Sequence, residues 1–121
     1  MTTDRTTAKK YVVLLAQDVE VWNNAPAAQQ ESWMDDHRRF DEHVAQHGAI
    51  LAGAALDGAS TATTVRHRGG QPVVTDGPFA ELVEQLGGFY LVELPSLDHA
   101  IEAVQLLPDC YSIEIRPTIE V

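Results

Sequence analysis

The sequence predicts an α+β fold, in which a ferredoxin-like antiparallel sheet carries two helices on one face. Short apolar runs rich in β-forming residues flank a stretch with helical spacing, and the same order returns near the end of the chain. Between these two β-α-β units lies a hairpin pattern with a pair of glycines. Because the second face of such a sheet would be uncovered, we expect a homodimer.

The composition is that of one globular domain. The chain has 121 residues, of which residues 1–9 are predicted to be a flexible tail and residues 10–121 a single domain. A net charge of −10 argues against nucleic acid as a partner, because phosphate binding needs a basic surface. Cys110 is the only cysteine, and no apolar run approaches the roughly 20 residues that cross a bilayer. We therefore expect a cytoplasmic protein with no membrane partner.

The first β-α-β unit starts with the apolar run 11–16, which is typical of a strand buried on both faces. Residues 17–25 show no clear period, and Asn23-Asn24 is predicted to mark a loop before Pro26 near a helix start. The pattern is helical over 27–47 and stops at Gly48, after which 49–56 is predicted to be a strand. One apolar stripe runs along this helix, formed by Trp33, His37, Phe40 and Val44.

The middle of the chain is predicted to be a hairpin. Its strands are expected over 61–68 and 71–75, joined through Gly69 and Gly70. An Asp-Gly-Pro turn follows at 76–78, where glycine and proline restrict the backbone to a sharp change of direction.

The second β-α-β unit follows this turn. One or two helical turns are expected over 80–86, and then a strand over 89–94. Ser96 is suited to cap a helix over 97–107, because its side chain can accept a backbone N–H. The last strand is predicted over 113–116, where apolar and charged residues alternate.

His37 is the strongest candidate for chemistry, since it stands in an otherwise apolar stripe. An imidazole there can act as a general acid or base near neutral pH. It can equally be a buried histidine that is bonded to a backbone carbonyl. Asp76 can orient or activate His37, or it can serve only the turn, where aspartate accepts local backbone hydrogen bonds.

Other polar residues are candidates for substrate binding. Arg66 can hold an anionic group through a forked pair of hydrogen bonds, or it can pair with an acid across the sheet. Thr64 shares its face of the strand. Glu84 and Glu81 can line the same site, although exposed carboxylates on a short acidic segment are more often solvated.

We predict no metal and no cofactor. His43 and His47 are one helical turn apart, with Asp36 two turns before His43, but these residues fall off the apolar stripe and lack a further ligand. The pair Gly87-Gly88 lacks the flanking pattern of a nucleotide-binding loop.

Several blocks of the sequence resemble the DGPF proteins of the YCII-related family. They are TDGPFAE at 75–81, EQLGGFY at 84–90 and SIEIRP at 112–117, and TATTVR at 61–66 is similar to the usual lead-in of that group. The likeness covers nearly the whole chain. It implies a ferredoxin-like fold that dimerises into an α/β barrel.

The resemblance implies less about activity. Most members have no assigned reaction, a related enzyme of aromatic degradation removes chloride, and some DGPF proteins occur beside extracytoplasmic-function sigma factors. In the wider family a histidine on the first helix and an aspartate are the proposed catalytic pair. That histidine precedes a helix-ending glycine by about eleven residues, which matches His37 and Gly48 here, and Asp76 is the candidate aspartate.

Two functions are therefore open. The first is a small cofactor-free enzyme in which His37 and Asp76 perform acid–base chemistry on a small molecule. The second is a noncatalytic module that binds a ligand or serves a sigma-factor partner. The architecture alone does not choose between them, because such folds host both kinds of function.

Overall fold

The structure, a computed structural model, describes residues 8–121. Its elements, in chain order, are β1 (Lys9–Gln17), α1 (Val19–Asn24), α2 (Ala27–His47), β2 (Ala49–Ala55), the 3-10 turn η1 (Ala59–Thr61), β3 (Thr63–Arg68), β4 (Gln71–Asp76), β5 (Gln85–Leu94), α3 (Leu97–Val104) and β6 (Ser112–Pro117). Residues 1–7 of the tail predicted over 1–9 lie outside the described residues, and β1 already includes Lys9.

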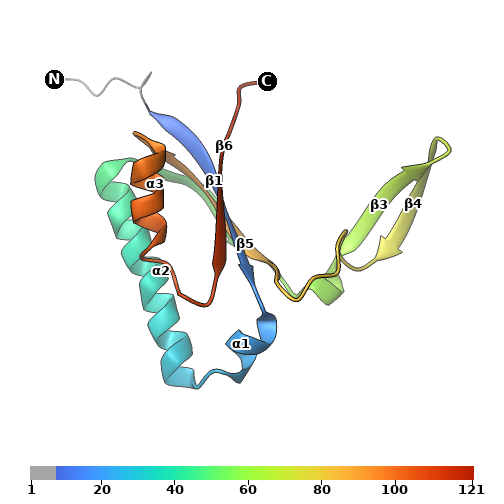
Figure 1. The fold of residues 1–121 in the computed structure, drawn as a ribbon, viewed down its shortest axis with the longest axis horizontal. Coiled ribbons are helices and arrows are strands. Elements are labelled where there is room, and N and C mark those ends of the chain that lie inside the picture. The colour runs from blue at the N-terminus through green and yellow to red at the C-terminus, as the bar shows by residue number, and fades with distance from the viewer. Residues whose placement is uncertain (1–7) are drawn as a thin grey trace.

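Four strands form one antiparallel sheet in the order β2-β5-β1-β6. The central strand β1 pairs with β5 on one side and with β6 on the other. Helices α2 and α3 lie on the same face, and no described element covers the opposite face (Figure 1). The predicted α+β class with an antiparallel sheet is therefore confirmed, whereas the dimeric barrel stays a prediction.

The core lies between the sheet and the two helices. Tyr11, Val13 and Leu15 of β1 are buried there, because alternate side chains of a strand point to the same face. From α2, Phe40 and Val44 are fully buried against them. Burying side chains of this size contributes roughly 1.5–3 kcal/mol each. These contacts hold α2 along the sheet and so fix where the rest of its apolar stripe lies.

Helix α2 passes directly into β2 through Gly48. The helix has the bounds predicted from the sequence, and the Gly48 N–H donates to the Val44 carbonyl at 2.8 Å. Strand β2 begins at the next residue and pairs with β5. A Cβ atom at Gly48 would lie 1.9 Å from the Glu93 carbonyl oxygen. The close approach of β5 therefore requires glycine at this position.

Helix α2 is also the longest helix, with 21 residues, and it carries two arginine–aspartate pairs on its exposed side. Within residues 8–121, no helix is both long enough and apolar enough to span a membrane.

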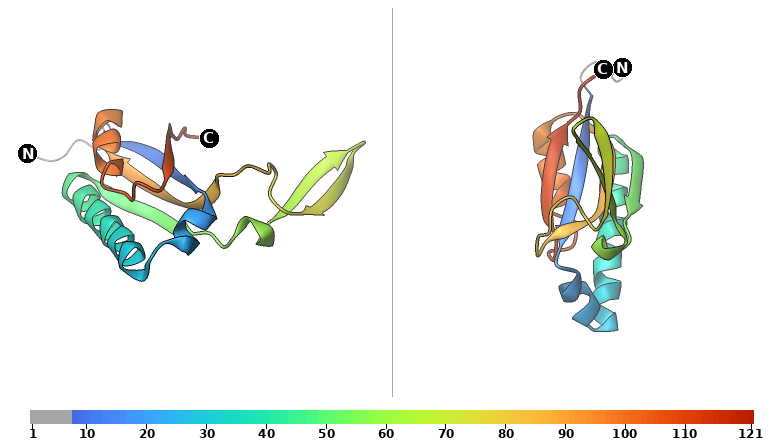
Figure 2. Two further views of the ribbon diagram at one scale, coloured as in Figure 1. Left: turned by 60° about the horizontal axis from the view of Figure 1, so that its bottom comes forward. Right: turned by 90° about the vertical axis from the view of Figure 1, so that its right-hand side faces the viewer.

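Strands β3 and β4 form a separate two-stranded sheet that extends away from the larger sheet (Figures 1 and 2). We call residues 62–79 the arm and the other described residues the body. The loop residues Gly69 and Gly70 have φ of 55° and 79°. Positive φ at both central residues suits a two-residue hairpin loop, and the predicted hairpin is confirmed.

Two local predictions were wrong. Asn23 and Asn24 do not form a loop but end the short helix α1, which Asp18 caps by accepting the Glu20 N–H at 3.0 Å. Residues 80–86 do not form helical turns, and β5 already begins at Gln85. Leu82 and Val83 are exposed by 67% and 79%, so a helix there would have no apolar surface on which to bury a face.

Replacing Gly48 tests the junction between α2 and β2. We expect Gly48→Ala to lower the free energy of unfolding by about 1–3 kcal/mol, because the added methyl group meets the backbone of β5. Urea unfolding provides the measurement. The control is Gly58→Ala, where the nearest atom to the new Cβ is the Ser60 Oγ at 3.8 Å. Equal stability of the two variants would contradict the close approach.

Candidate functional site

A cleft of about 710 Å³ opens between α1, the middle of α2 and the end of the sheet from which the arm departs. This volume is in the range of small-molecule sites. Much of its wall is apolar, with contributions from Leu15, Trp22, Met34, Ile50 and Phe89. Its polar lining includes His37, Tyr90 and Tyr111.

His37 forms a hydrogen bond through each nitrogen of its ring. Its Nδ1 lies 2.7 Å from the Tyr90 hydroxyl oxygen, and its Nε2 lies 2.9 Å from the Tyr111 hydroxyl oxygen. Both tyrosines line the cleft. The ring of Phe40 packs on Tyr90 with the ring centroids 4.7 Å apart. The core stripe of α2 therefore positions this group of three.

Burial determines the charge of this group. Desolvation lowers the pKa of His37 below the ordinary 6.5, although the negative charges of Asp41 and Asp36 oppose the shift. Desolvation raises the pKa of Tyr90 and of Tyr111 to about 12. It also raises the pKa of Asp41, against the influence of His37. At neutral pH the site therefore holds a neutral imidazole between two neutral phenols.

A proton count shows what this arrangement can do. A neutral imidazole carries one N–H and one lone pair. One tyrosine must therefore donate its O–H to the ring, while the other accepts the ring N–H. The accepting tyrosine keeps its own O–H, which is free to donate into the cleft. Exchanging the two tautomers exchanges these roles, so the group can take up a proton at one end and release another at the other end.

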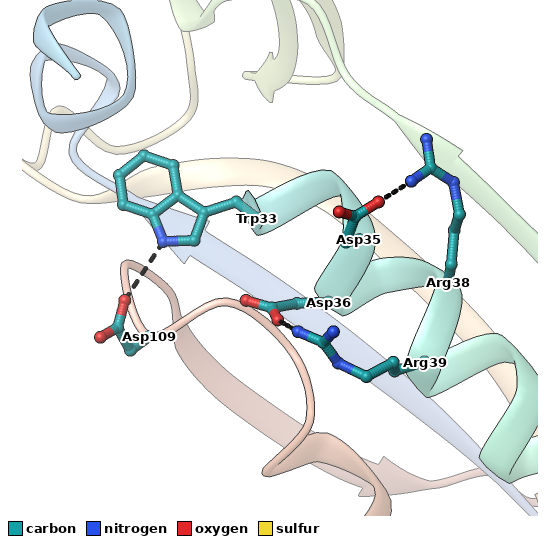
Figure 3. A network of polar contacts seen from close by, with 6 residues as sticks. All are labelled: Trp33, Asp35, Asp36, Arg38, Arg39 and Asp109. Carbon is teal, nitrogen blue, oxygen red and sulfur yellow. Dashed lines mark hydrogen bonds and ion pairs between the residues drawn. The ribbon is translucent and has the colours of Figure 1, made fainter. Parts of the chain in front are cut away.

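A second set of contacts fixes the loop that carries Tyr111 (Figure 3). The Trp33 indole N–H of α2 donates to the Asp109 carboxylate at 3.3 Å, two residues before Tyr111. This hydrogen bond holds the loop before β6 against α2.

Two ion pairs on α2 reduce the positive charge available near the cleft. Arg38 pairs with Asp35, and Arg39 pairs with Asp36 (Figure 3). Arg38 is among the residues that line the cleft. Asp41 lines the cleft as well, one helical turn after His37. The cleft therefore does not offer an unpaired cation for an anionic group.

The structure places the other predicted site residues outside this cleft. Asp76 is the last residue of β4 and pairs with Thr63. It does not line the cleft. It is also not among the groups that shift the pKa of His37. Within one chain, His37 and Asp76 are therefore not brought together. The catalytic role of Asp76 stays a prediction.

The residues predicted to bind substrate form hydrogen bonds within the chain. The Thr64 hydroxyl donates to the Gly77 carbonyl at 2.7 Å, and Arg66 donates to the Phe79 carbonyl at 2.7 Å. Glu84 accepts a hydrogen bond of 2.6 Å from the Ser112 hydroxyl. Thr64 and Arg66 thus fix the segment after β4 to β3, and their predicted part in substrate binding is untested.

The sequence analysis missed Tyr90, Tyr111 and Asp41. Tyr90 was assigned only to a strand, although it belongs to one of the blocks that carry the family resemblance. Asp41 follows His37 by four residues, a spacing that places two side chains on the same side of a helix. That signal was available. Nothing local distinguished Tyr111, which meets His37 across 74 residues of chain.

The histidines near the C-terminal end of α2 form a separate cluster. The ring centroids of His43 and His47 are 4.6 Å apart, and those of His47 and His99 are 5.9 Å apart. No group of three or more histidine, cysteine or acidic residues in the described chain is arranged to hold a metal ion.

Comparison with known proteins finds two matches. The model of the YCII-related domain matches residues 10–120. An uncharacterized protein of Rhizobium meliloti (strain 1021) is 36% identical over 111 residues, which cover 88% of this chain and 90% of the relative. The family match includes the whole of the cleft and the arm.

Titration of the His37 ring by NMR tests the electrostatics of the site. We expect a pKa below 6.5, and a further decrease in Asp41→Asn, because the lost carboxylate favours the protonated ring. The control is Asp35→Asn, which removes a carboxylate that pairs with Arg38. A pKa above 6.5, or a rise in Asp41→Asn, would show that burial does not dominate.

The same shift makes stability depend on pH. Below pH 6.5 the unfolded chain protonates His37 more readily than the folded chain does, so the free energy of unfolding falls as the pH decreases from 6.5. We expect this fall to be smaller in His37→Gln, as measured by urea unfolding between pH 7.5 and pH 5. His43→Gln controls for the loss of a histidine from the same helix. Parallel pH profiles for His37→Gln and the wild type would argue against the shift.

Proposed function

Since this chain belongs to the YCII-related family, we propose that it is a small enzyme in which His37, with Tyr90 and Tyr111, transfers protons on a small molecule without a cofactor. One observation carries the proposal: each nitrogen of a half-buried imidazole is bonded to a tyrosine hydroxyl at the wall of a cleft. A histidine with only a structural role needs one partner, commonly a backbone carbonyl. Two titratable partners that both reach the cleft form a path for protons.

The proposed reaction moves one proton out of the substrate and another into it. The substrate gives a proton to the oxygen of the tyrosine that donates to His37, and this tyrosine passes its own proton to the ring. The opposite ring nitrogen gives its proton to the second tyrosine, whose O–H proton goes to another atom of the substrate. In each cycle the three side chains together gain one proton and lose one proton, and the His37 ring ends in its other tautomer. This is the chemistry of an isomerisation, or of an elimination in which one proton leaves with the departing group.

The cleft favours a neutral and largely apolar substrate. Its wall is mostly apolar, Arg38 is paired with Asp35, and Asp41 adds negative charge beside His37. A carbonyl group is the natural acceptor for a tyrosine O–H that has no other partner. A compound with an acidic C–H next to a carbonyl would supply both the proton to be removed and the acceptor.

The proposal includes a homodimer in the cytoplasm. The uncovered face of the sheet carries partly exposed Val12, Leu14 and Leu91, which alternate with the core residues of β1 and β5. Packing this face against a second copy would remove apolar surface from water. The single cysteine is consistent with a reducing compartment.

A noncatalytic ligand-binding module is the second candidate, and one observation favours it. Both nitrogens of His37 are already occupied by tyrosines, so the ring does not reach a ligand directly. The same hydroxyls would then only hold a ligand in place. A sigma-factor partner would be compatible with such a module.

Hydrogen exchange distinguishes the two candidates. A panel of cyclic ketones, 1,3-diketones and lactones is incubated with the protein in D₂O, and deuterium uptake is followed by mass spectrometry. We expect uptake at carbon that falls by about 100-fold or more in His37→Gln, and that falls in Tyr90→Phe and Tyr111→Phe, as for loss of a general acid–base group. His43→Gln is the control, because it removes a histidine outside the cleft.

Thermal shift measurements with the same panel complete the test. Compounds that stabilise the wild type and His37→Gln equally, with no protein-dependent deuterium uptake, would support the binding module. Uptake that is unchanged in His37→Gln would exclude His37 as the base.

A further inference from the structure

Helix α1 is held to the rest of the chain by little packing. None of its six residues is buried, and Val19 and Val21 are exposed by 50% and 49%. A helix of this length is not stable by itself in water. The position of α1 therefore depends on the contacts that it makes with its neighbours.

Two interactions at Trp22 join α1 to the beginning of α2. The rings of Trp22 and Trp33 stack with their centroids 5.3 Å apart. The side-chain amide of Gln30 donates to the Trp22 carbonyl at 2.8 Å. Trp33 is buried and is bonded to Asp109, so it belongs to the fixed part of the molecule. A segment with so little buried apolar surface opens locally at a small cost in free energy.

The same helix forms one wall of the cleft. Val19 and Trp22 line the cleft together with His37. Figure 1 shows α1 between the end of β1 and the start of α2, two elements that contribute to the core. The helix can therefore move away from Trp33 without disturbing the sheet. A ligand in the cleft contacts Val19 and Trp22 only while α1 is docked, so its binding favours the docked position.

The residue directly before the N-cap of α1 carries an unsatisfied polar atom. The side-chain oxygen of Gln17 is buried and has no hydrogen-bond partner among the described residues. Gln17 follows Val13 and Leu15 on the same face of β1, and it lines the cleft. A buried acceptor without a partner is costly. A movement of α1 that brings water or a ligand O–H to this oxygen removes that cost.

We propose that α1 is a lid of the cleft: it undocks from Trp33 to admit a ligand, and it docks again over the bound ligand. The hinges are Asp18, which caps α1, and Ala25, which is extended and leads into Pro26. Lids of this kind exclude water from a site while the ligand is bound. The lid rests on the proposed function only in that the cleft is a ligand site, and it serves the enzyme and the binding module alike.

Fluorine NMR of the free protein tests the docking. The chain has two tryptophans, which are the two partners of the stack. Labelling with 5-fluorotryptophan therefore gives two resonances, and Trp22→Phe assigns them. We expect relaxation dispersion in the Trp22 resonance, from exchange in the microsecond to millisecond range.

The Gln30 variant tests what holds the lid. Gln30→Ala is expected to raise the undocked population about fivefold, as for the loss of one hydrogen bond. The control is Gln29→Ala, which changes the neighbouring exposed glutamine and is expected to leave this population unchanged. Neither glutamine lines the cleft, so the comparison reports on the lid alone.

Thiol labelling tests whether the same motion opens the cleft. Leu15 lines the cleft and is 3% exposed, so Leu15→Cys is made in a Cys110→Ser background. We expect iodoacetamide to modify this cysteine about fivefold faster when Gln30→Ala is added, and at an unchanged rate with Gln29→Ala. Labelling through global unfolding is distinguished by its steep increase in low urea. If Leu15→Cys does not fold, the fluorine measurement decides.

Two results would overturn the lid. One is a Trp22 resonance without exchange in both the wild type and Gln30→Ala. The other is labelling of Leu15→Cys that occurs only through global unfolding. Neither measurement uses a substrate, so a failure of the deuterium exchange leaves the lid intact, and a rigid α1 leaves the proposed function intact.

Discussion

The two hydrogen bonds of His37 are the constraint on which the site depends. They can form together only if three segments meet at one place: α2, the middle of β5 and the loop before β6. The partners are 53 and 74 residues away along the chain, so the completed fold is needed to bring them within 2.7 and 2.9 Å. The buried side chains of Phe40 and Val44 hold α2 against the sheet. The hydrogen bond from Trp33 to Asp109 holds the loop before β6 against α2. The cleft is therefore built by the same contacts that build the core.

This dependence separates the body from the arm. The body has a continuous core and carries the cleft, whereas the arm gains almost nothing from that core. The segment that most clearly identifies the family, at 75–81, lies where the arm returns to the body. Gly77 has a φ of 100°, and its carbonyl is held by Thr64, so the turn has a structural explanation of its own. The motif that identifies the chain and the group that suits its chemistry are thus different parts of the molecule.

The sequence predicted the parts of the fold whose signals are local. Helix α2 was predicted to the residue, since its stripe recurs from Trp33 to Val44 and Gly48 ends it. Helix α1 was missed, because six residues are too few to show a period, and a single cap at Asp18 decides its start. The helical turns expected over 80–86 are absent, because Leu82 and Val83 would find no apolar surface there on which a helix could pack.

The site was predictable only in part, for the same reason. His37 could be found, since a polar residue in an apolar stripe stands out in one helix. Tyr90 and Tyr111 could not, because their role exists only after α2 has packed against β5 and the loop before β6. Asp76 drew attention through a turn motif that is strong in sequence, although its carboxylate does not reach the cleft of its own chain.

The direct passage from α2 into β2 has a consequence for how such chains can vary in length. With Gly48 alone between helix and strand, one inserted residue would shift the register of β2 and send each of its side chains to the opposite face. The same insertion at the tip of the arm would lengthen a hairpin that the body does not contact. We therefore expect insertions and deletions among related chains to collect in the arm and to be absent from the junction at Gly48.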